Sequence, residues 1–246
     1  MLACSTASFP ADEPLRALLK IAWAGYSAAE FALAGGALPD EGALTARLRE
    51  EGLELAALEA GMLPAGDTEE LFQGLACVGR ACALARSADC SRVIVAAPQS
   101  GTLEELQTAL ERLDLALGGL AVELCLVNRS ESLLAEPAAF RELWGRGLPP
   151  RLRPALDPAQ AVRSGWDPVE LDLLPVLPTH LYLTDLREGR EASAGEGTVG
   201  LPRLLAELRD RNFRGTVALR LQGAGLWEVE PRVQELREWF EYWWSA

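Results

Sequence analysis

The sequence has a single histidine, His180, and a single lysine, Lys20, among its 246 residues. One imidazole cannot supply a histidine-rich metal centre, so that class of hydrolytic site is excluded. The formal net charge is −13 and the isoelectric point lies near 4.7. An acidic chain repels phosphate backbones and anionic lipid, so we expect neither a nucleic acid nor a membrane as a partner.

Long hydrophobic runs and paired cysteines are also missing. No apolar run approaches the roughly 20 residues that span a bilayer, and residues 1–5 do not begin a secretory leader. We therefore expect a cytoplasmic protein. The five cysteines form no C-x-x-C pair, and an odd number of them in a chain rich in apolar residues indicates reduced thiols (Cys4, Cys77, Cys82, Cys90 and Cys125).

Several catalytic signatures are absent as well. The sequence has no G-x-S-x-G elbow, no Walker loop and no H-E-x-x-H helix, and Gly195–Gly197 lacks the strand-to-helix setting of a dinucleotide fingerprint. A cysteine–histidine nucleophile could only pair His180 with Cys125, and we do not favour that pairing.

Short β-type runs alternate with longer helical patterns from end to end, which is typical of βα units and a parallel sheet. Eight units fit, and about 250 residues is the usual size of such a barrel. We predict an α/β protein, a single (β/α)8 TIM barrel, with one domain over residues 1–246. The expected strands are Leu2–Thr6, Ala28–Leu33, Leu53–Glu59, Arg92–Ala97, Ala121–Val127, Leu152–Leu156, Leu181–Asp185 and Thr216–Leu221.

Apolar spacing and capping residues place the helices between these strands. Asp40 and Asp67 are expected to be N-caps, and Gly25 to end the first helix. The expected helices are Asp12–Ala24, Asp40–Glu51, Asp67–Arg86, Leu103–Leu117, Pro137–Gly145, a short one after Asp157, Leu201–Arg211 and Pro231–Trp244. Five aromatic residues crowd residues 239–244; they predict a helix packed on the barrel wall or, alternatively, a partner surface.

Six short segments spread over nearly the whole chain are informative when taken together: Ser5–Pro10, Ala24–Glu30, Leu156–Ala161, His180–Asp185, Gly195–Val199 and Phe213–Gly215. In order and spacing they resemble motifs of the xylose-isomerase-like barrel family, which contains sugar-phosphate isomerases, ketose epimerases and relatives of endonuclease IV. Ser5–Pro10 is similar to the family's first strand and loop, and the other segments are similar, in the order given, to A-G-Y-x-x-x-E, L-D-x-x-H-A, H-x-H-x-K-D, G-E-G-x-V and Y-x-G.

The resemblance implies one divalent cation (Mn, Mg, Co or Zn) at the barrel mouth, bound by three carboxylates and a histidine. In the family this cation polarises substrate oxygens. Asp157 keeps the carboxylate after strand six. The strand-five glutamate corresponds to Val127 or Asn128, the strand-seven histidine to Tyr182 and the strand-eight glutamate to Arg220. Three of the four ligand positions are replaced, so we predict no metal and no other cofactor.

Two further family histidines correspond to Arg129 and Gln160. A guanidinium at position 220 would repel a cation, because arginine has essentially no neutral form. We hypothesise that Arg220 pairs with Asp157 and replaces the ion, which avoids a buried unpaired carboxylate.

The candidate catalytic residues are Glu30, Asp157 and His180, and the candidate ligand-binding residues are Arg129, Asp185 and Arg220. Each has a structural alternative. Glu30 would be a base, a hydroxyl acceptor or, as we favour, an arginine's partner, and Glu59 is a weaker parallel. His180 would move protons or, more often for a lone histidine on a buried strand, belong to the core. Asp185 is expected to organise the following loop.

Two functions remain open. The first is a divergent sugar or sugar-phosphate isomerase or epimerase without the family's metal; the second is a non-catalytic barrel that serves in binding or assembly. A small sugar-like or anionic ligand, held by Arg129 and Arg220, would be compatible with either function. Homo-oligomers are also compatible with both functions. An endonuclease of the endonuclease IV type needs three metals and a basic face, so we reject it. An apolar or salt-bridged mouth would favour the second function.

Overall fold

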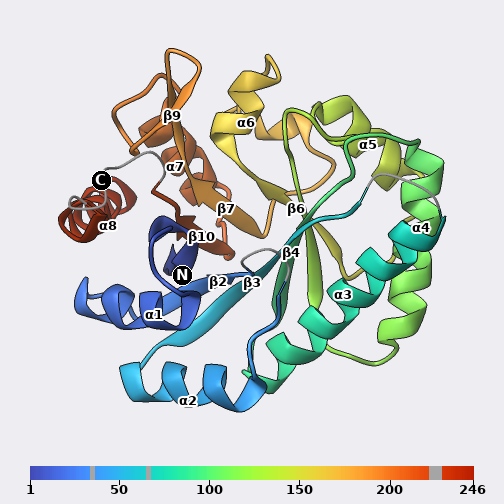
Figure 1. The fold of residues 1–246 in the computed structure, drawn as a ribbon. Coiled ribbons are helices and arrows are strands. Elements are labelled where there is room, and N and C mark those ends of the chain that lie inside the picture. Colours follow the sequence, from blue (N-terminus) through green and yellow to red (C-terminus); the bar gives the residue numbers. More distant parts are fainter. Residues whose placement is uncertain (34–36, 65–67, 222–228) are drawn as a thin grey trace.

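The computed structural model describes residues 1–33, 37–64, 68–221 and 229–246. Its parallel strands close into a barrel in the order β1-β10-β7-β6-β5-β4-β3-β2 (Figure 1). The predicted (β/α)8 barrel is therefore confirmed. The barrel strands are β1 (Leu2–Ser5), β2 (Ala28–Ala32), β3 (Glu54–Met62), β4 (Arg92–Ala96), β5 (Glu123–Val127), β6 (Leu152–Leu156), β7 (His180–Leu183) and β10 (Thr216–Leu219).

Helices surround the barrel, and α8 lies beside α7 at the edge of Figure 1 where the chain ends. No helix among the described residues is long and apolar enough to cross a membrane. The α-helices are α1 (Pro14–Trp23), α2 (Glu41–Glu51), α3 (Thr68–Ser87), α4 (Leu103–Leu117), α5 (Pro137–Gly145), α6 (Pro158–Arg163), α7 (Leu201–Asp210) and α8 (Val229–Ser245).

Local sequence accounts for several helix ends. Asp40 caps α2 by accepting a hydrogen bond from the Ala43 amide, as predicted. At the start of α4, Thr102 and Glu105 form a reciprocal capping box. Gly25, at φ +82°, follows the end of α1. The predicted cap at Asp67 lies outside the described residues.

The segment after β7 differs from the prediction. Strand β7 ends at Leu183, and Asp185 begins a separate hairpin of β8 (Asp185–Arg187) and β9 (Arg190–Ala192). Its two turn residues, Glu188 and Gly189, both have positive φ, as tight two-residue hairpin turns require. The sequence predicts one strand over Leu181–Asp185 and no hairpin, because Glu-Gly is a weak turn signal and the two hairpin strands are three residues each.

Apolar side chains form one large core between the strands and the helices, while a second small cluster fills the barrel interior. Half of the inner cluster is alanine, with Tyr182 the bulkiest member. Small inward residues leave volume for long charged side chains inside the barrel, since a protein interior is packed without large voids. The inner cluster consists of Ala57, Ile94, Ala96, Cys125, Val127, Ala155, Tyr182 and Ala218.

The C-terminal aromatic residues divide between the core and the surface. Phe240 is buried and stacks on Trp244, which in turn meets Phe213 edge-on. These contacts match the expected helix packed against the barrel wall. Tyr242 is 66% exposed. The alternative of a partner surface stays a prediction.

Gly215 is a position where the barrel tolerates no side chain. A Cβ atom there would overlap the backbone carbonyl of Thr179, which accepts a hydrogen bond from the Thr216 amide. Gly215→Ala should therefore lower the free energy of unfolding by about 1–3 kcal/mol. Gly119→Ala is the control, because its Cβ would meet nothing within 4 Å. Urea denaturation of both variants tests this, and equal midpoints would contradict it.

Candidate functional site

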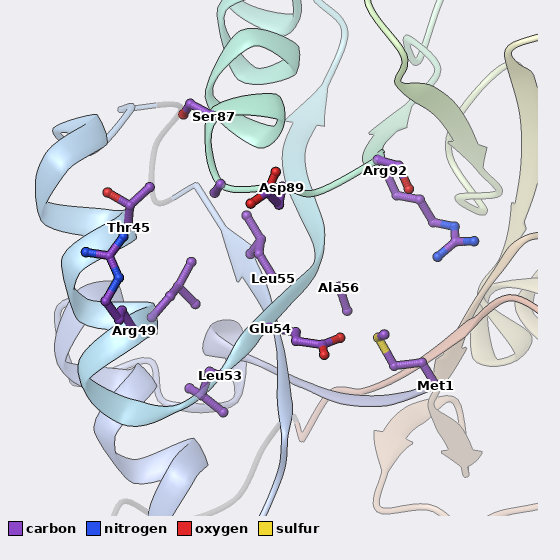
Figure 2. Close-up of a pocket in the computed structure, with 13 residues that line it drawn as sticks. Met1, Thr45, Arg49, Leu53, Glu54, Leu55, Ala56, Ser87, Asp89 and Arg92 are labelled. Carbon is purple, nitrogen blue, oxygen red and sulfur yellow. The ribbon is translucent and has the colours of Figure 1, made fainter.

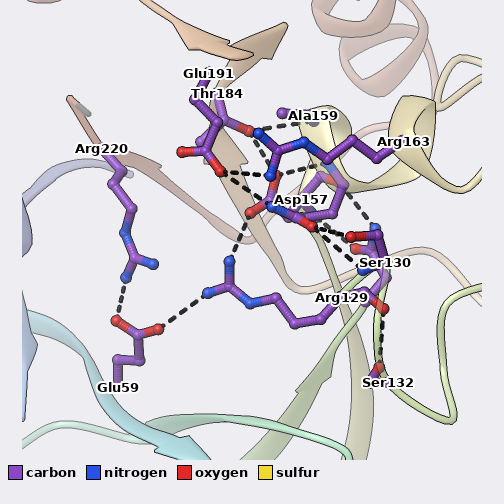
Figure 3. Close-up of polar contacts among 12 residues, drawn as sticks. Glu59, Arg129, Ser130, Ser132, Asp157, Ala159, Arg163, Thr184, Glu191 and Arg220 are labelled. Carbon is purple, nitrogen blue, oxygen red and sulfur yellow. Dashed lines mark hydrogen bonds and ion pairs between the residues drawn. The ribbon is translucent and has the colours of Figure 1, made fainter. Parts of the chain in front are cut away.

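Charged side chains meet at the end of the barrel where the parallel strands terminate. Arg129, Asp157 and Arg220 each lie within two residues of a strand end, after β5, β6 and β10. Glu30 lies on β2 and Glu59 on β3. Figure 3 shows Arg129 and Arg220 approaching Glu59 from two sides. The carboxyl ends of parallel strands all face one way, so residues distant in sequence meet here.

These five side chains form one ion-pair network. Arg220 Nη2 lies 3.1 Å from Glu30 Oε1 and also contacts Glu59 Oε2. Arg129 Nη2 lies 3.3 Å from Glu59 Oε1, and its Nη1 lies 3.2 Å from Asp157 Oδ2. Glu59 thus bridges the two guanidinium groups (Figure 3).

The hypothesis that Arg220 pairs with Asp157 is therefore wrong. Asp157 forms its ion pair with Arg129, whereas Arg220 pairs with Glu30 and Glu59. The physical reason is proximity around the barrel. Strands β5 and β6 are neighbours, so the residues that follow them lie side by side.

An aromatic and imidazole layer lies deeper in the barrel. The Arg220 guanidinium sits 4.3 Å from the centroid of the Tyr182 ring, a cation–π contact. The His180 ring meets Tyr182 edge-on at 4.8 Å, and its Nε2 lies 2.9 Å from Glu30 Oε2. Glu30 and His180 are both 0% exposed. This places two of the three catalytic candidates in the interior, paired with each other.

The surroundings of Glu30 keep it ionised. Burial by itself raises the pKa of this carboxyl, but the His180 imidazole, 2.9 Å away, and the charge of Arg220 outweigh it and lower the pKa from 4.5 to about 2. A buried carboxylate held this way balances the guanidinium above it rather than acting as a base ready to accept a proton.

Asp157 is engaged on every side. Its Oδ1 caps α6 through the Gln160 amide and accepts the Thr184 hydroxyl at 2.7 Å, while Oδ2 holds Arg129. The Asn128 side-chain amide donates to the backbone carbonyl of Asp157 and accepts from the backbone amide of Asp157. Asp157 is 1% exposed. The local sequence suits this capping role, which was not predicted, because aspartate is a favoured N-cap and Pro158 occupies the first helical position.

Glu191 belongs to the same face but was not among the predicted residues. It lies on β9, and its Oε1 accepts from Gln160 Nε2 at 3.1 Å and from Arg163 Nη1 at 3.3 Å. Burial and the nearby Asp157 charge raise the pKa of Glu191. It was missed because the hairpin that carries it was not predicted.

Asp185 organises the loop after the hairpin. Its two carboxylate oxygens accept hydrogen bonds from four backbone amides, those of Leu186, Gly195, Gly197 and Val199. A Cβ atom on Gly197 would overlap this carboxylate, so the G-E-G motif provides the close backbone approach. Asp185 therefore acts here as a structural anchor, and ligand binding by it stays a prediction.

The arrangement does not fit a divalent cation. Among residues 1–33, 37–64, 68–221 and 229–246, no three histidine, cysteine or acidic side chains are grouped to hold an ion. The Arg220 guanidinium lies between the carboxylates of Glu30 and Glu59. Cys125, the candidate nucleophile, is buried, and burial raises the pKa of its thiol to about 12. A thiolate is thus strongly disfavoured.

A cavity of about 480 Å³ lies at the opposite end of the barrel, near the starts of β3 and β4 (Figure 2). Arg49, Glu54 and Arg92 are among its charged lining residues. Arg92 is already bonded to Glu123 and to the Thr216 hydroxyl. This end does not carry the predicted site residues, which belong to the mouth.

The Asp185 anchor predicts a local loss of stability on neutralisation. Asp185→Asn replaces one acceptor oxygen by an amide that faces backbone N–H groups, so it should cost about 1–3 kcal/mol in the free energy of unfolding. Asp210→Asn, at an exposed position on α7, should have little effect. Denaturant titration of both variants checks this; an unchanged Asp185→Asn protein would contradict the anchor role.

The low pKa of Glu30 predicts acid sensitivity. A carboxyl with a lowered folded-state pKa contributes stability above its unfolded value, and that contribution is lost as pH falls from about 4.5 to about 2. Glu30→Gln should flatten the fall in unfolding free energy over this interval. Glu104→Gln, on the surface of α4, should keep the native profile; parallel profiles for both would count against the assignment.

Comparison with known proteins agrees with the barrel fold. Solved structures with similar folds include a D-tagatose 3-epimerase-like protein (TM-score 0.84, 15% identity, 99% of this chain and 97% of that one) and L-ribulose 3-epimerase (0.83, 14%, 99% and 94%). Another is D-psicose 3-epimerase with D-tagatose from Clostridium cellulolyticum H10 (0.81, 13%, 99% and 99%). No curated protein matches the sequence. Residues 18–243 match the family described as xylose isomerase-like TIM barrel, and the chain belongs to that family.

Proposed function

We propose that this chain is a sugar isomerase/epimerase-like barrel that works without the family's divalent cation, and that it serves in binding or assembly rather than catalysis. The observation that carries the proposal is the ion-pair network at the mouth, in which Glu59 bridges Arg129 and Arg220. Isomerisation and epimerisation of sugars need a group that removes a proton from carbon and a positive centre that stabilises the resulting enediolate.

Neither requirement is well served by the described residues. Glu30 and His180 are fully buried and contact each other, so a substrate at the mouth would not reach them. Both carboxylate oxygens of Asp157 are already in contact with the α6 cap, Thr184 and Arg129. The positive groups are neutralised by carboxylates before any ligand arrives.

An active, metal-independent isomerase or epimerase is the competing function. The similar structures named as epimerases support it only through the fold, because their sequences are 13–15% identical to this one. Glu59 and Arg129, whose side chains are 14% and 17% exposed, are the charged groups of the network that a sugar would meet first.

A small sugar-like or anionic ligand remains part of the proposal. An anion at Arg129 or Arg220 would have to displace carboxylates already in contact with them, which weakens its binding. A neutral polyol can donate hydrogen bonds to the carboxylates and accept them from the guanidiniums, so its binding does not require a carboxylate to be displaced.

Metal content and activity test the proposal together. The purified protein should contain far less than one equivalent of Mn, Mg, Co or Zn, and chelation should leave its melting temperature unchanged. It should not epimerise D-psicose or D-tagatose, with or without added Mn²⁺. Stoichiometric, tightly held metal would overturn the metal-free part. Turnover without metal, abolished by Glu59→Gln but not by Glu104→Gln, would establish the competing function.

A further inference from the structure

One carboxylate oxygen at the barrel mouth has no hydrogen-bond partner among the described residues. Glu191, on β9, accepts at its Oε1 from Gln160 Nε2 at 3.1 Å and from Arg163 Nη1 at 3.3 Å. Its Oε2 is buried and accepts from none of them, although the side chain as a whole is 14% exposed. A buried carboxylate oxygen without a donor is costly, so this atom is suited to accept a hydrogen bond from a bound molecule.

Glu191 adjoins the ion-pair network of the mouth. In Figure 3 it lies close to Asp157, between Arg163 on one side and Arg220 on the other. Gln160 links the two carboxylates, because its backbone amide donates to Asp157 Oδ1 while its side-chain amide donates to Glu191. A ligand that reaches the network from outside would therefore also meet Glu191.

The charges that meet at the mouth do not balance. Four carboxylates and three guanidiniums are joined there, directly or through Gln160, which leaves one negative charge in excess. At pH 8 an imidazole is ordinarily uncharged, and segments 34–36, 65–67 and 222–228 contain no arginine, lysine or histidine that would add positive charge. The carboxylates are those of Glu30, Glu59, Asp157 and Glu191, and the guanidiniums those of Arg129, Arg163 and Arg220.

The excess falls on Glu191. Arg129 and Arg220 are shared among the other three carboxylates, and Arg163 contacts only Oε1 of Glu191. Burial and then the charge of Asp157 raise the pKa of Glu191, and the nearby guanidiniums do not offset these two effects. The negative charge of Glu191 is therefore incompletely compensated by the protein, and a positive charge on a ligand would stabilise it.

We propose that the mouth binds a polyol or sugar that carries a protonated amine, with the ammonium group bonded to Glu191 Oε2 and the hydroxyl groups bonded to Glu59 and Arg129. This rests on the proposed function in one respect, that the mouth binds a small sugar-like molecule. An ammonium group needs no set of three protein ligands, because a single carboxylate accepts one of its hydrogens and the hydroxyl groups supply the other contacts. A phosphate group would instead add to the excess of negative charge.

Two open-chain molecules that differ in one group test the proposal. D-Glucamine carries an ammonium group where D-sorbitol carries a hydroxyl, and an alkyl ammonium stays charged at pH 8. In calorimetric titration at pH 8 and low salt, the native protein should bind D-glucamine at least about tenfold more tightly than D-sorbitol, because hydrogen bonds to charged groups are the stronger ones. A sorbitol phosphate should bind more weakly than D-sorbitol.

The Glu191→Gln variant removes the charge and keeps the size of the side chain. It should bind D-glucamine and D-sorbitol with affinities within about twofold of each other. Glu188→Gln is the matched control, because Glu188 is exposed in the turn of the same hairpin, and it should keep the native preference. If Glu191→Gln does not fold, N-acetyl-D-glucamine takes its place: it keeps the nitrogen without the charge, and the native protein should bind it no more tightly than D-sorbitol.

Each outcome decides. A preference for D-glucamine that is lost in Glu191→Gln and kept in Glu188→Gln supports the proposal. Equal binding of D-glucamine and D-sorbitol by the native protein refutes it and leaves a neutral ligand in place. A preference that survives Glu191→Gln refutes the assigned carboxylate, and binding of neither molecule refutes the proposal and leaves assembly as the function. Metal-independent epimerase activity would refute the non-catalytic function alone, since the selection for a charged amine is measured by binding.

Discussion

Neutralisation of buried charge at the barrel mouth is the constraint on which the site depends. Glu30 and Asp157 are almost completely buried, and each has an arginine in contact. Because Glu59 contacts both guanidiniums, the two ion pairs share one carboxylate and form a single unit. Removing one partner from such a unit typically costs about 3–5 kcal/mol. Substitutions at these positions are therefore coupled, and a single exchange toward a metal ligand would leave the rest unbalanced.

The barrel interior explains how such large charged groups are accommodated. Inward positions on several strands carry alanine, including Ala57, Ala155 and Ala218. The volume they leave is taken by Tyr182 and by the guanidiniums that lie against its ring at the mouth. The aromatic face attracts the cation above it, while burial in turn strengthens the attraction between that cation and Glu30. Packing and electrostatics thus favour the same arrangement.

Much of the fold was predictable because its signals are local. Apolar periodicity and capping residues gave α4 (Leu103–Leu117) and β6 (Leu152–Leu156) with their observed bounds. The β8–β9 hairpin was missed, since short strands on a Glu-Gly turn carry little signal. The pairing of Arg220 was wrong for a different reason. Its strand, β10, lies two places from β6 on one side and two places from β2 on the other, so order alone does not choose between Asp157 and Glu30.

Adjacency would have resolved that choice. Arg129 and Asp157 follow the neighbouring strands β5 and β6, and once Asp157 is taken, Arg220 is left with carboxylates on β2 and β3. The same geometry bears on function. A divalent ion offers exchangeable coordination positions and polarises a carbonyl, whereas a guanidinium offers only hydrogen bonds in fixed directions. The arginines balance the charge of the buried carboxylates at the mouth. A guanidinium in that place offers a substrate oxygen no open coordination position.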